Sequence, residues 1–351
     1  MGRSDAINDT KAGRSGYRPK WGSWILAFRL LFNYRGRLSR RRILRRTVQF
    51  SNAALDYYEY RGTVVGTLIF IHGMSALGRE DPRVVHLAES IASIGYRVLV
   101  PDFPSIRALE IRTEQGSEVL ARLEALLRDQ KLVPGNFLLM AVSFSTVFAL
   151  RAACTEFLAR RISGLCLIGG YFDVSVVASF ITKSNRSDLY ARLLVLRNYY
   201  RQVKPGAIKH QRVLERSLAE NIEQDSAWNP EFAFDKADAI ELQIYRMLTD
   251  PEERNRVSER ITHVFKKDWN EYQSKVDFIY HGIPVFLIHG RNDRIIPSGE
   301  SKRLARRLVE KDVPVYLCVT QFLDHGNSSL RFSQCSEFFR LLRGFAWFFR
   351  V

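Results

Sequence analysis

The chain has 351 residues and a formal net charge of +16, and its composition is 46% hydrophobic and 12% aromatic. This apolar content excludes a disordered or low-complexity chain and is enough for a sizeable core. Residues 1–50 hold thirteen basic and two acidic residues, which accounts for eleven of the sixteen net charges. The rest of the chain is nearly neutral, which argues against a body built to bind nucleic acid.

Residues 1–46 are predicted to form a basic arm followed by an amphipathic helix. Residues 1–20 are polar, and an arginine-rich segment spans 35–46. An apolar stripe between them has helical spacing and consists of Trp21, Trp24, Ile25, Phe28, Leu31 and Phe32. This composition is typical of a helix that lies on an anionic membrane surface. The alternative is that the stripe packs on the body while the arginines are solvated.

From residue 47 onward, apolar strands alternate with helices. Helices are predicted over 82–94 and 114–128, and an aromatic-rich helix ends the segment 328–350. Strands are predicted over 47–51, 55–60, 64–71, 97–102, 137–142, 165–168, 285–288 and 313–319. Near-unbroken apolar runs between helices predict an α/β fold with a mostly parallel central sheet and helices on both faces. Residues 47–173 and 278–351 form this predicted core.

Residues 174–277 interrupt the alternation, because they contain helical patterns and no convincing strand. We predict that this segment is an inserted α-helical cap at the edge where the strands end. Its aromatic residues are expected to be mainly core rather than a substrate pocket. They are Phe180, Tyr190, Tyr199, Tyr200, Trp228, Phe232 and Phe234.

The strand at 137–142 leads directly into a helical pattern through Ser143. The residues two positions away, Ala141 and Ser145, are small, as a strained turn between a strand and a helix requires. Ser145 is a poorer candidate, because Val147 would then crowd the turn. The alternative is a serine that caps an ordinary helix, since both glycines of a G-x-S-x-G motif are absent. The pattern favours Ser143 as a nucleophile.

An oxyanion hole for acyl transfer requires two main-chain N–H groups that converge on the developing negative charge. One is expected from Phe144, which follows the nucleophile. The other is expected from Met74, which follows His72-Gly73 at the end of the strand 64–71. We expect His72 itself to be structural.

The remaining two groups of a catalytic triad are predicted after later strands. Asp293 follows the strand 285–288, and His325 lies in a loop beyond the strand 313–319. The chain order Ser, Asp, His, each after its own strand, is typical of a nucleophile–acid–base triad. Asp173, which follows the strand 165–168, is the alternative acid.

In these motifs the chain resembles the α/β-hydrolase superfamily, over about residues 47–351, and is most similar to its smaller lipase, esterase and peptidase-like members. The resemblance implies a serine hydrolase that cleaves a carboxylic ester through an acyl-enzyme, without cofactor or metal. It implies a small acyl-ester or lipid-like substrate. A thioesterase, an acyltransferase and a non-catalytic binding protein are the alternatives on the same fold.

The four cysteines are far apart and form no CxxC or Cys/His cluster, so the sequence predicts neither a zinc site nor a disulfide framework. Buried free thiols indicate a reducing compartment, and we expect a cytoplasmic protein. The apolar stretch 24–32 is interrupted by Arg29 and is too short to span a bilayer. Membrane association would therefore be peripheral.

Overall fold

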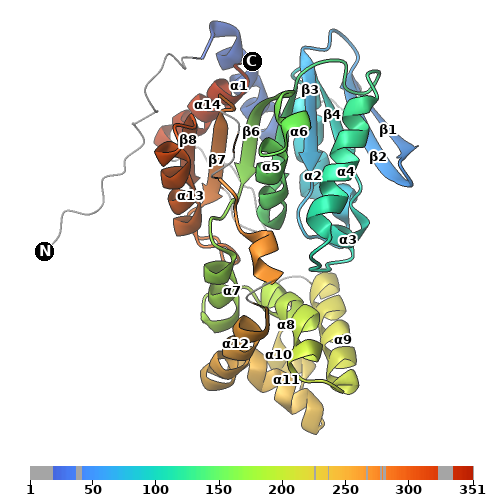
Figure 1. Ribbon diagram of the computed structural model, residues 1–351, viewed down its shortest axis with the longest axis vertical. Helices are drawn as coiled ribbons and strands as arrows, with labels where there is room; N and C mark the ends of the chain where they lie inside the picture. Colours follow the sequence, from blue (N-terminus) through green and yellow to red (C-terminus); the bar gives the residue numbers. More distant parts are fainter. Residues whose placement is uncertain are drawn as a thin grey trace, which may run out of the picture.

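The structure is a computed structural model that describes residues 19–36, 42–224, 227–235, 237–265, 268–276, 279, 282–322 and 335–350. It is built on one eight-stranded sheet (Figure 1). The strands are β1 (Ile43–Phe50), β2 (Ala53–Tyr60), β3 (Gly66–Ile71), β4 (Tyr96–Pro101), β5 (Phe137–Val142), β6 (Ile162–Ile168), β7 (Val285–Gly290) and β8 (Val315–Thr320).

The strand order across the sheet is β1-β2-β4-β3-β5-β6-β7-β8. Strands β3 to β8 are parallel to one another, whereas β2 pairs antiparallel with both β1 and β4. The predicted α/β class with a mostly parallel sheet is therefore confirmed. All parallel strands end at the same edge, which brings the segments after β3, β5, β6, β7 and β8 to one side of the molecule.

The first strand begins earlier than the sequence pattern predicts. Strand β1 starts at Ile43 and includes Arg45, so part of the predicted basic arm belongs to the sheet. Its residues are mostly exposed, and the Arg45 guanidinium lies 2.9 Å from the buried Asp56 carboxylate on β2. The two strands are joined by Ser51 and Asn52, both with positive φ, as a tight two-residue hairpin requires.

Helices cover both faces of the sheet, as predicted. One face is covered by α1 (Trp21–Arg35), α2 (Pro82–Ala92) and α14 (Cys335–Phe348). The other is covered by α4 (Gln115–Arg128), α5 (Thr146–Ala153), α6 (Glu156–Ala159) and α13 (Ser298–Glu310), with the short α3 (Pro104–Arg107) and the 3₁₀ turn η2 (Gly78–Glu80) in loops. Helix α14 comes so close to β7 that a β-carbon at Gly344 would collide with the Phe286 ring.

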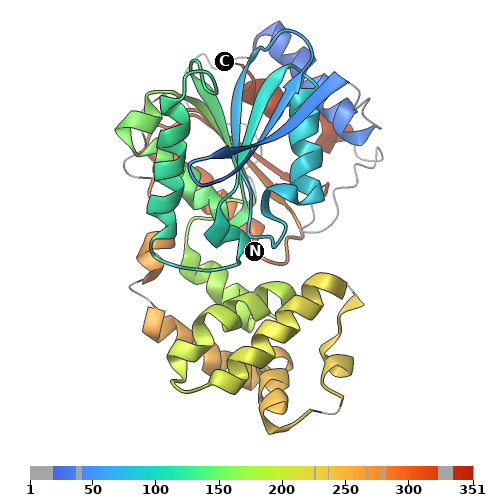
Figure 2. The ribbon, with the colours of Figure 1, turned by 90° about the vertical axis from the view of Figure 1, so that its right-hand side faces the viewer.

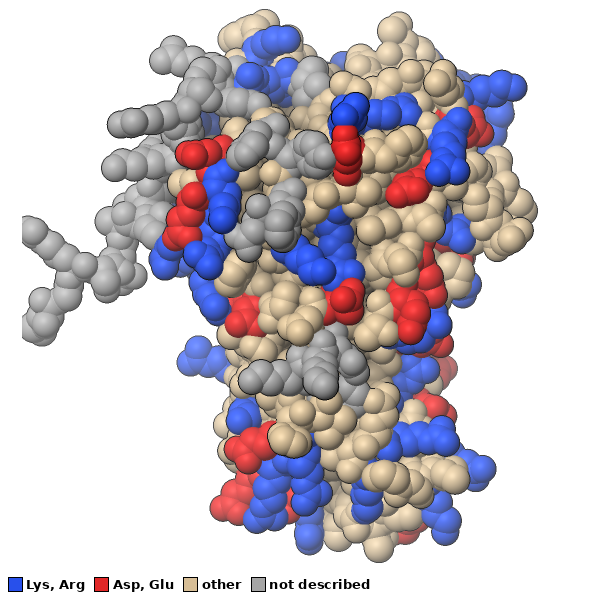
Figure 3. Space-filling model, viewed as in Figure 1, with Lys and Arg blue, Asp and Glu red and all other residues tan. Residues whose placement is uncertain are grey.

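A helical segment lies between β6 and β7 in the sequence and forms a separate layer beyond the strand ends (Figures 1 and 2). It comprises α7 (Val174–Lys183), α8 (Leu189–Val203), α9 (Ile208–Gln224), α10 (Pro230–Ala233), α11 (Ala239–Thr249), α12 (Pro251–Phe265) and the 3₁₀ turn η5 (Asp268–Tyr272). On the face shown in Figure 3, basic and acidic side chains are interspersed over this layer and over the sheet region, as expected for a nearly neutral body.

Helix α8 fastens the helical segment to the sheet region. Arg197 donates hydrogen bonds to the Ala108 and Leu109 carbonyl oxygens, both at 3.0 Å. The Asp188 N–H donates to the carbonyl oxygen of Arg294, which follows β7. These contacts lie beyond the carboxyl ends of the strands, where the sequence predicts the insertion.

The aromatic side chains of the insertion differ in burial. Four of the seven are buried and, as predicted, belong to a core that is continuous with one face of the sheet, namely Tyr199, Tyr200, Trp228 and Phe234. Phe232 does not follow this prediction, because its side chain is 81% exposed. It lies on the four-residue helix α10, which is too short to bury a second face.

The guanidinium of Arg192 on α8 is buried inside the helical segment and binds backbone oxygens of its neighbours. It donates to the carbonyl oxygens of Ile181, Ser184 and Leu248. Burial lowers the pKa of Arg192 to about 10, with the nearby Arg254 acting in the same direction. The side chain therefore remains charged at neutral pH and links three parts of the insertion.

Replacing Arg192 by leucine is expected to lower the free energy of unfolding by about 3 kcal/mol, because several buried oxygens lose a charged donor. Urea unfolding followed by tryptophan fluorescence measures the change. The control is Arg216→Leu on α9, a half-exposed arginine paired with Glu241, for which we expect a loss of less than about 1 kcal/mol. Equal losses in the two variants would contradict the structural role of Arg192.

Candidate active site

Ser143 occupies a sharp turn between strand β5 and helix α5. The 3₁₀ turn η3 (Ser143–Ser145) joins the two elements directly, and the φ angle of Ser143 is +56°. Residues other than glycine rarely adopt a positive φ, and such strained positions cluster at active sites. Thr146 fixes the turn by donating a hydrogen bond to the Ser143 carbonyl oxygen at 2.7 Å. This is the geometry expected of a nucleophile elbow.

The alternative interpretation, in which Ser143 caps an ordinary helix, is not supported by this geometry. An N-cap residue has an extended backbone, and its side chain accepts a hydrogen bond from the first turn. Ser143 has instead a left-handed conformation, and the N-cap position of α5 is Ser145, which makes no such bond.

Ser145 has a structural role at the turn. Its side chain is fully buried, and its hydroxyl donates to the His72 carbonyl oxygen at 2.6 Å. This bond connects the elbow to the segment that follows β3. A β-carbon built at Gly73 would lie 3.7 Å from the Ser143 β-carbon, so the two segments are in contact.

His72 holds the segment in which one oxyanion donor is predicted. It is fully buried, and its Nδ1 donates to the Gly73 carbonyl oxygen at 3.0 Å while its Nε2 accepts the Phe103 N–H at 3.3 Å. Burial lowers the pKa of His72, so the ring is neutral at physiological pH. The ring thus fixes the peptide unit that carries the Met74 N–H, in the structural role expected of it.

The two predicted oxyanion donors, Met74 and Phe144, directly follow Gly73 and Ser143 and are partly buried. The Met74 carbonyl oxygen accepts a hydrogen bond from the Tyr190 hydroxyl of α8 at 3.1 Å. The Phe144 ring packs against Tyr272 of η5, with ring centroids 5.1 Å apart. Both donors are therefore in contact with the helical insertion.

Asp293 is a buried carboxylate in the loop after β7. One oxygen accepts the N–H groups of Ile295 and Ile296, both at 2.8 Å. The other lies 3.3 Å from Nε2 of His289. The His289 ring is itself held by the Ile296 carbonyl oxygen and the Ser301 hydroxyl. These contacts fix the carboxylate in one orientation at the strand-end edge.

Asp173, the alternative acid, caps the N-terminus of α7. Its carboxylate accepts the Ser175 N–H and hydroxyl as well as the Gln273 amide, and Arg303 lies 3.7 Å away. Burial opposes ionisation, but these hydrogen bonds and the positive charge outweigh it and lower the pKa of Asp173. This carboxylate is thus committed to the helix cap, whereas Asp293 lies after β7, next to β8.

His325 lies outside the described residues, which end at 322 and resume at 335. The last described residues before it follow β8, and Glu337 of α14 holds them. The buried Glu337 carboxylate accepts the Thr320 hydroxyl at 2.9 Å and the Gln321 N–H at 2.7 Å, and Arg291 lies 3.4 Å away. The described end of β8 therefore lies beside the loop that contains Asp293. The roles of Ser143, Asp293 and His325 stay predictions.

No protein-family model matches the sequence, and no curated protein matches it. The structure is similar to carboxyl esterase 2 from the fungus Tuber melanosporum (12% identity, 91% of this chain and 90% of that one, TM-score 0.49) and to esterase B from Lactobacillus rhamnosis (14%, 87% and 84%, 0.47). It is also similar to an acylaminoacyl peptidase from Pyrococcus horikoshii, with 13% sequence identity and a TM-score of 0.46. The match covers 86% of this chain and spans 40% of the length of the peptidase.

The sheet order, the helices on both faces and a strained serine between β5 and α5 together decide the fold. The chain has the α/β-hydrolase fold. The architecture that the sequence motifs predict is thereby confirmed.

The sequence analysis did not identify two residues that support the candidate site. His289 contacts the Asp293 carboxylate, and Glu337 anchors the end of β8. Each carries a weak signal in the sequence, since His289 ends an apolar strand and Glu337 is the one acidic residue of an otherwise apolar and basic helix. Neither signal identifies a partner, because the contacts arise only from tertiary packing.

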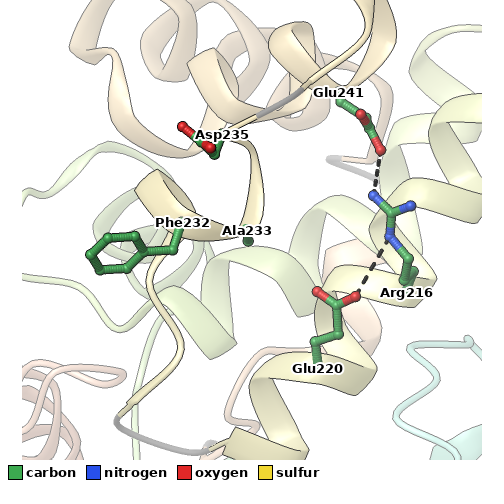
Figure 4. A pocket seen from close by; sticks show the side chains of 6 residues that line it. All are labelled: Arg216, Glu220, Phe232, Ala233, Asp235 and Glu241. Atoms are coloured by element: carbon green, nitrogen blue, oxygen red, sulfur yellow. Dashed lines mark hydrogen bonds and ion pairs between the residues drawn. The ribbon is translucent and has the colours of Figure 1, made fainter.

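A shallow hollow on the helical insertion of this hydrolase fold lies apart from the predicted site. Helices α9, α10 and α11 form it, and Figure 4 shows its lining residues Arg216, Glu220, Phe232, Ala233, Asp235 and Glu241. Arg216 pairs with both Glu241 and Glu220, so its charge is compensated within the hollow. No predicted site residue lines it.

Within the described ranges, no three His, Cys, Asp or Glu side chains are grouped as a metal ion would require. Among the described residues, Cys154, Cys166 and Cys318 form no disulfide bond, and burial raises the pKa of the Cys166 thiol well above its usual range. Among the described helices, none is long and apolar enough to cross a membrane.

Proposed function

We propose that the protein is a serine hydrolase that cleaves carboxylic esters, with Ser143 as nucleophile, His325 as general base and Asp293 as the acid that orients the base. The observation that carries the proposal is the positive φ of Ser143 at the end of β5. Strained positions of this kind cluster at active sites, which supports a functional role for a serine, rather than a glycine, at this turn.

In the proposed reaction, His325 accepts the proton of the Ser143 hydroxyl as its oxygen attacks the ester carbonyl carbon. The new C–O bond converts the carbonyl oxygen into an oxyanion, which the N–H groups of Met74 and Phe144 stabilise. Collapse of this intermediate breaks the bond to the alcohol, which leaves with the proton from His325. Water then attacks the acyl-enzyme by the same sequence and releases the carboxylic acid.

The surroundings of Asp293 support its role. Two main-chain N–H groups and His289 hold the carboxylate, so it does not need to reorient during the reaction. A fixed carboxylate selects one tautomer of the histidine it contacts and stabilises the imidazolium that forms. The capping contacts of Asp173 do not favour this role.

We further propose that residues 174–277 act as a cap that shapes access to Ser143. The Tyr190 hydroxyl contacts the Met74 carbonyl oxygen, and the Tyr272 ring contacts Phe144. Both contacts join the insertion to residues that flank the nucleophile. An apolar acyl group is the substrate part that such aromatic surroundings favour.

Purified full-length protein is expected to hydrolyse p-nitrophenyl butyrate with a higher kcat/KM than the matched anilide, because an amine is a poorer leaving group than p-nitrophenol even when His325 protonates it. The matched thioester is the third substrate. Nitrophenol release and the carboxylic acid product are measured together. Transfer of the butyryl group to added alcohols or amines in preference to water would indicate an acyltransferase. Absence of turnover on all three substrates would contradict the proposal and favour a binding protein.

A further inference from the structure

Helix α1 has an apolar face that the rest of the described structure does not cover. Its inner face is buried against α14 and α2 through Ala27, Leu30 and Leu31. Its outer face carries Trp21, Ile25, Phe28 and Phe32, all exposed. The sequence predicts a single stripe that contains both kinds of residue, but the structure separates them: of that stripe, only Leu31 is fully buried.

The exposed residues form one continuous ridge, which we call the α1 ridge (Trp21, Ile25, Phe28 and Phe32). Their spacing of four, three and four residues places them on one side of the helix. Trp21 is 81% exposed, Phe28 53% and Phe32 66%, and the Phe28 and Phe32 rings are stacked with centroids 6.3 Å apart. Isolated exposed apolar side chains are common, but a contiguous aromatic ridge marks an interaction surface.

The helix that displays this ridge is firmly attached to the body. Asn33 donates to the Ser93 hydroxyl at 2.8 Å, and His86 donates through Nε2 to the Tyr34 carbonyl oxygen at 2.7 Å. At the other end, the Ser23 hydroxyl donates to the Phe349 carbonyl oxygen at 3.3 Å. The ridge is therefore presented by a rigid element along its whole length and does not require a folding step on binding.

The charge around the ridge indicates the chemistry of its partner. Between Asp9 and Asp56 the sequence holds twelve Lys and Arg residues and no acidic one. Three of the twelve, Lys20, Arg29 and Arg35, are exposed at or on α1 itself. A second copy of the chain would bring two basic surfaces together, which like-charge repulsion disfavours. Trp and Phe beside Lys and Arg is the composition that interfacial membrane helices share.

We propose that the α1 ridge docks on an anionic lipid bilayer, with its aromatic side chains inserted among the acyl chains and the neighbouring Lys and Arg side chains at the headgroups. This surface is independent of the proposed hydrolase site. It corresponds to the membrane interpretation of residues 21–46, with the difference that the inserted residues are those of the outer face and that α1 stays packed on the body.

Flotation of the full-length protein with vesicles tests the proposal. We expect binding to vesicles of phosphatidylcholine with about 30% phosphatidylglycerol, an anionic lipid that should attract the Lys and Arg side chains beside the ridge. Binding to pure phosphatidylcholine is expected to be at least about tenfold weaker, and added salt is expected to weaken the anionic interaction. Failure to bind the anionic vesicles would overturn the proposal. Dimerisation through the ridge without vesicle binding would do the same.

Matched variants locate the surface. Trp21→Ser, Phe28→Ser and Phe32→Ser combined are expected to lower vesicle affinity at least about tenfold. Phe232→Ser removes an equally exposed aromatic ring from the helical insertion and is expected to leave binding unchanged. Arg29→Gln with Arg35→Gln should weaken binding, whereas Arg128→Gln with Arg160→Gln on the body should not. Equal binding by the triple variant and the wild type would refute the assignment.

Further measurements distinguish a loss of membrane binding from misfolding and from a loss of the proposed hydrolase activity. Quenching of Trp21 fluorescence by brominated lipid is expected in the wild type and is expected to fall in Trp21→Phe, which still binds. Circular dichroism and hydrolysis of a water-soluble ester are expected to be unchanged in the triple variant, because its side chains are exposed and lie on a helix remote from Ser143 in the fold. If the triple variant loses both vesicle binding and its helical circular dichroism signal, the loss of binding reflects unfolding. The variant Arg29→Gln with Arg35→Gln then tests whether this surface binds the membrane.

Discussion

Replacing Asp293 by asparagine is expected to lower kcat for ester hydrolysis by about 10⁴-fold, while the protein keeps its fold. Asparagine is nearly isosteric and can still accept the N–H groups of Ile295 and Ile296. Its amide cannot stabilise an imidazolium, and it favours the wrong tautomer of the histidine. The change therefore acts on the chemistry rather than on folding, and steady-state kinetics with p-nitrophenyl butyrate measures it.

Asp173→Asn is the matched control. Asparagine is as good an N-cap as aspartate, so helix α7 should remain capped. We expect kcat to stay within about threefold of the wild type, since this carboxylate is engaged by Ser175 and Gln273. The reverse pattern, with a large loss in Asp173→Asn and little change in Asp293→Asn, would assign the acid to the strand β6 loop instead.

Ser143→Ala is expected to reduce turnover by about 10⁶-fold, because the covalent route is lost. Ser145→Ala is its control within the same turn. Ser145 donates a buried hydrogen bond to the His72 carbonyl oxygen, and its loss should cost about 1 kcal/mol of stability and less than about tenfold in rate. Comparable losses in both variants would mean that the turn as a whole matters, and not a nucleophile at 143.

Sequence reasoning was most successful where a pattern is local. The strand before Ser143 is a continuous apolar run. Small residues two positions away on both sides of the serine predict a sharp turn, and Ser143 has the positive φ of such a turn. The strands of the parallel sheet were predicted for the same reason. The helical insertion was predicted from the absence of such runs.

The sequence pattern was less informative where tertiary contacts determine the bounds or the buried face of an element. Strand β1 begins at Ile43 because Arg45 pairs with Asp56 across the hairpin, a contact that an arginine-rich sequence does not reveal. Helix α1 is apolar around most of its circumference, so its pattern could not distinguish the buried from the exposed face. Small residues, Ser23 and Ala27, determine that face by allowing α14 to approach.

The supporting contacts of the site depend on tertiary structure in the same way. His289 touches Asp293 within one turn of chain, but its orientation is set by Ser301 on α13. Glu337 reaches the end of β8 from α14, and Tyr190 reaches Met74 from α8. The last two contacts join residues that are far apart in the sequence, and the residue types alone indicate no partner.

Covalent labelling is the most direct test of whether Ser143 is an activated nucleophile. The wild type is treated with a fluorophosphonate probe, and the modified peptide is identified by mass spectrometry. We expect one phosphonylated residue, Ser143, with labelling abolished in Ser143→Ala and retained in Ser145→Ala. Labelling that persists in Ser143→Ala, or no labelling of the folded wild type, would contradict it.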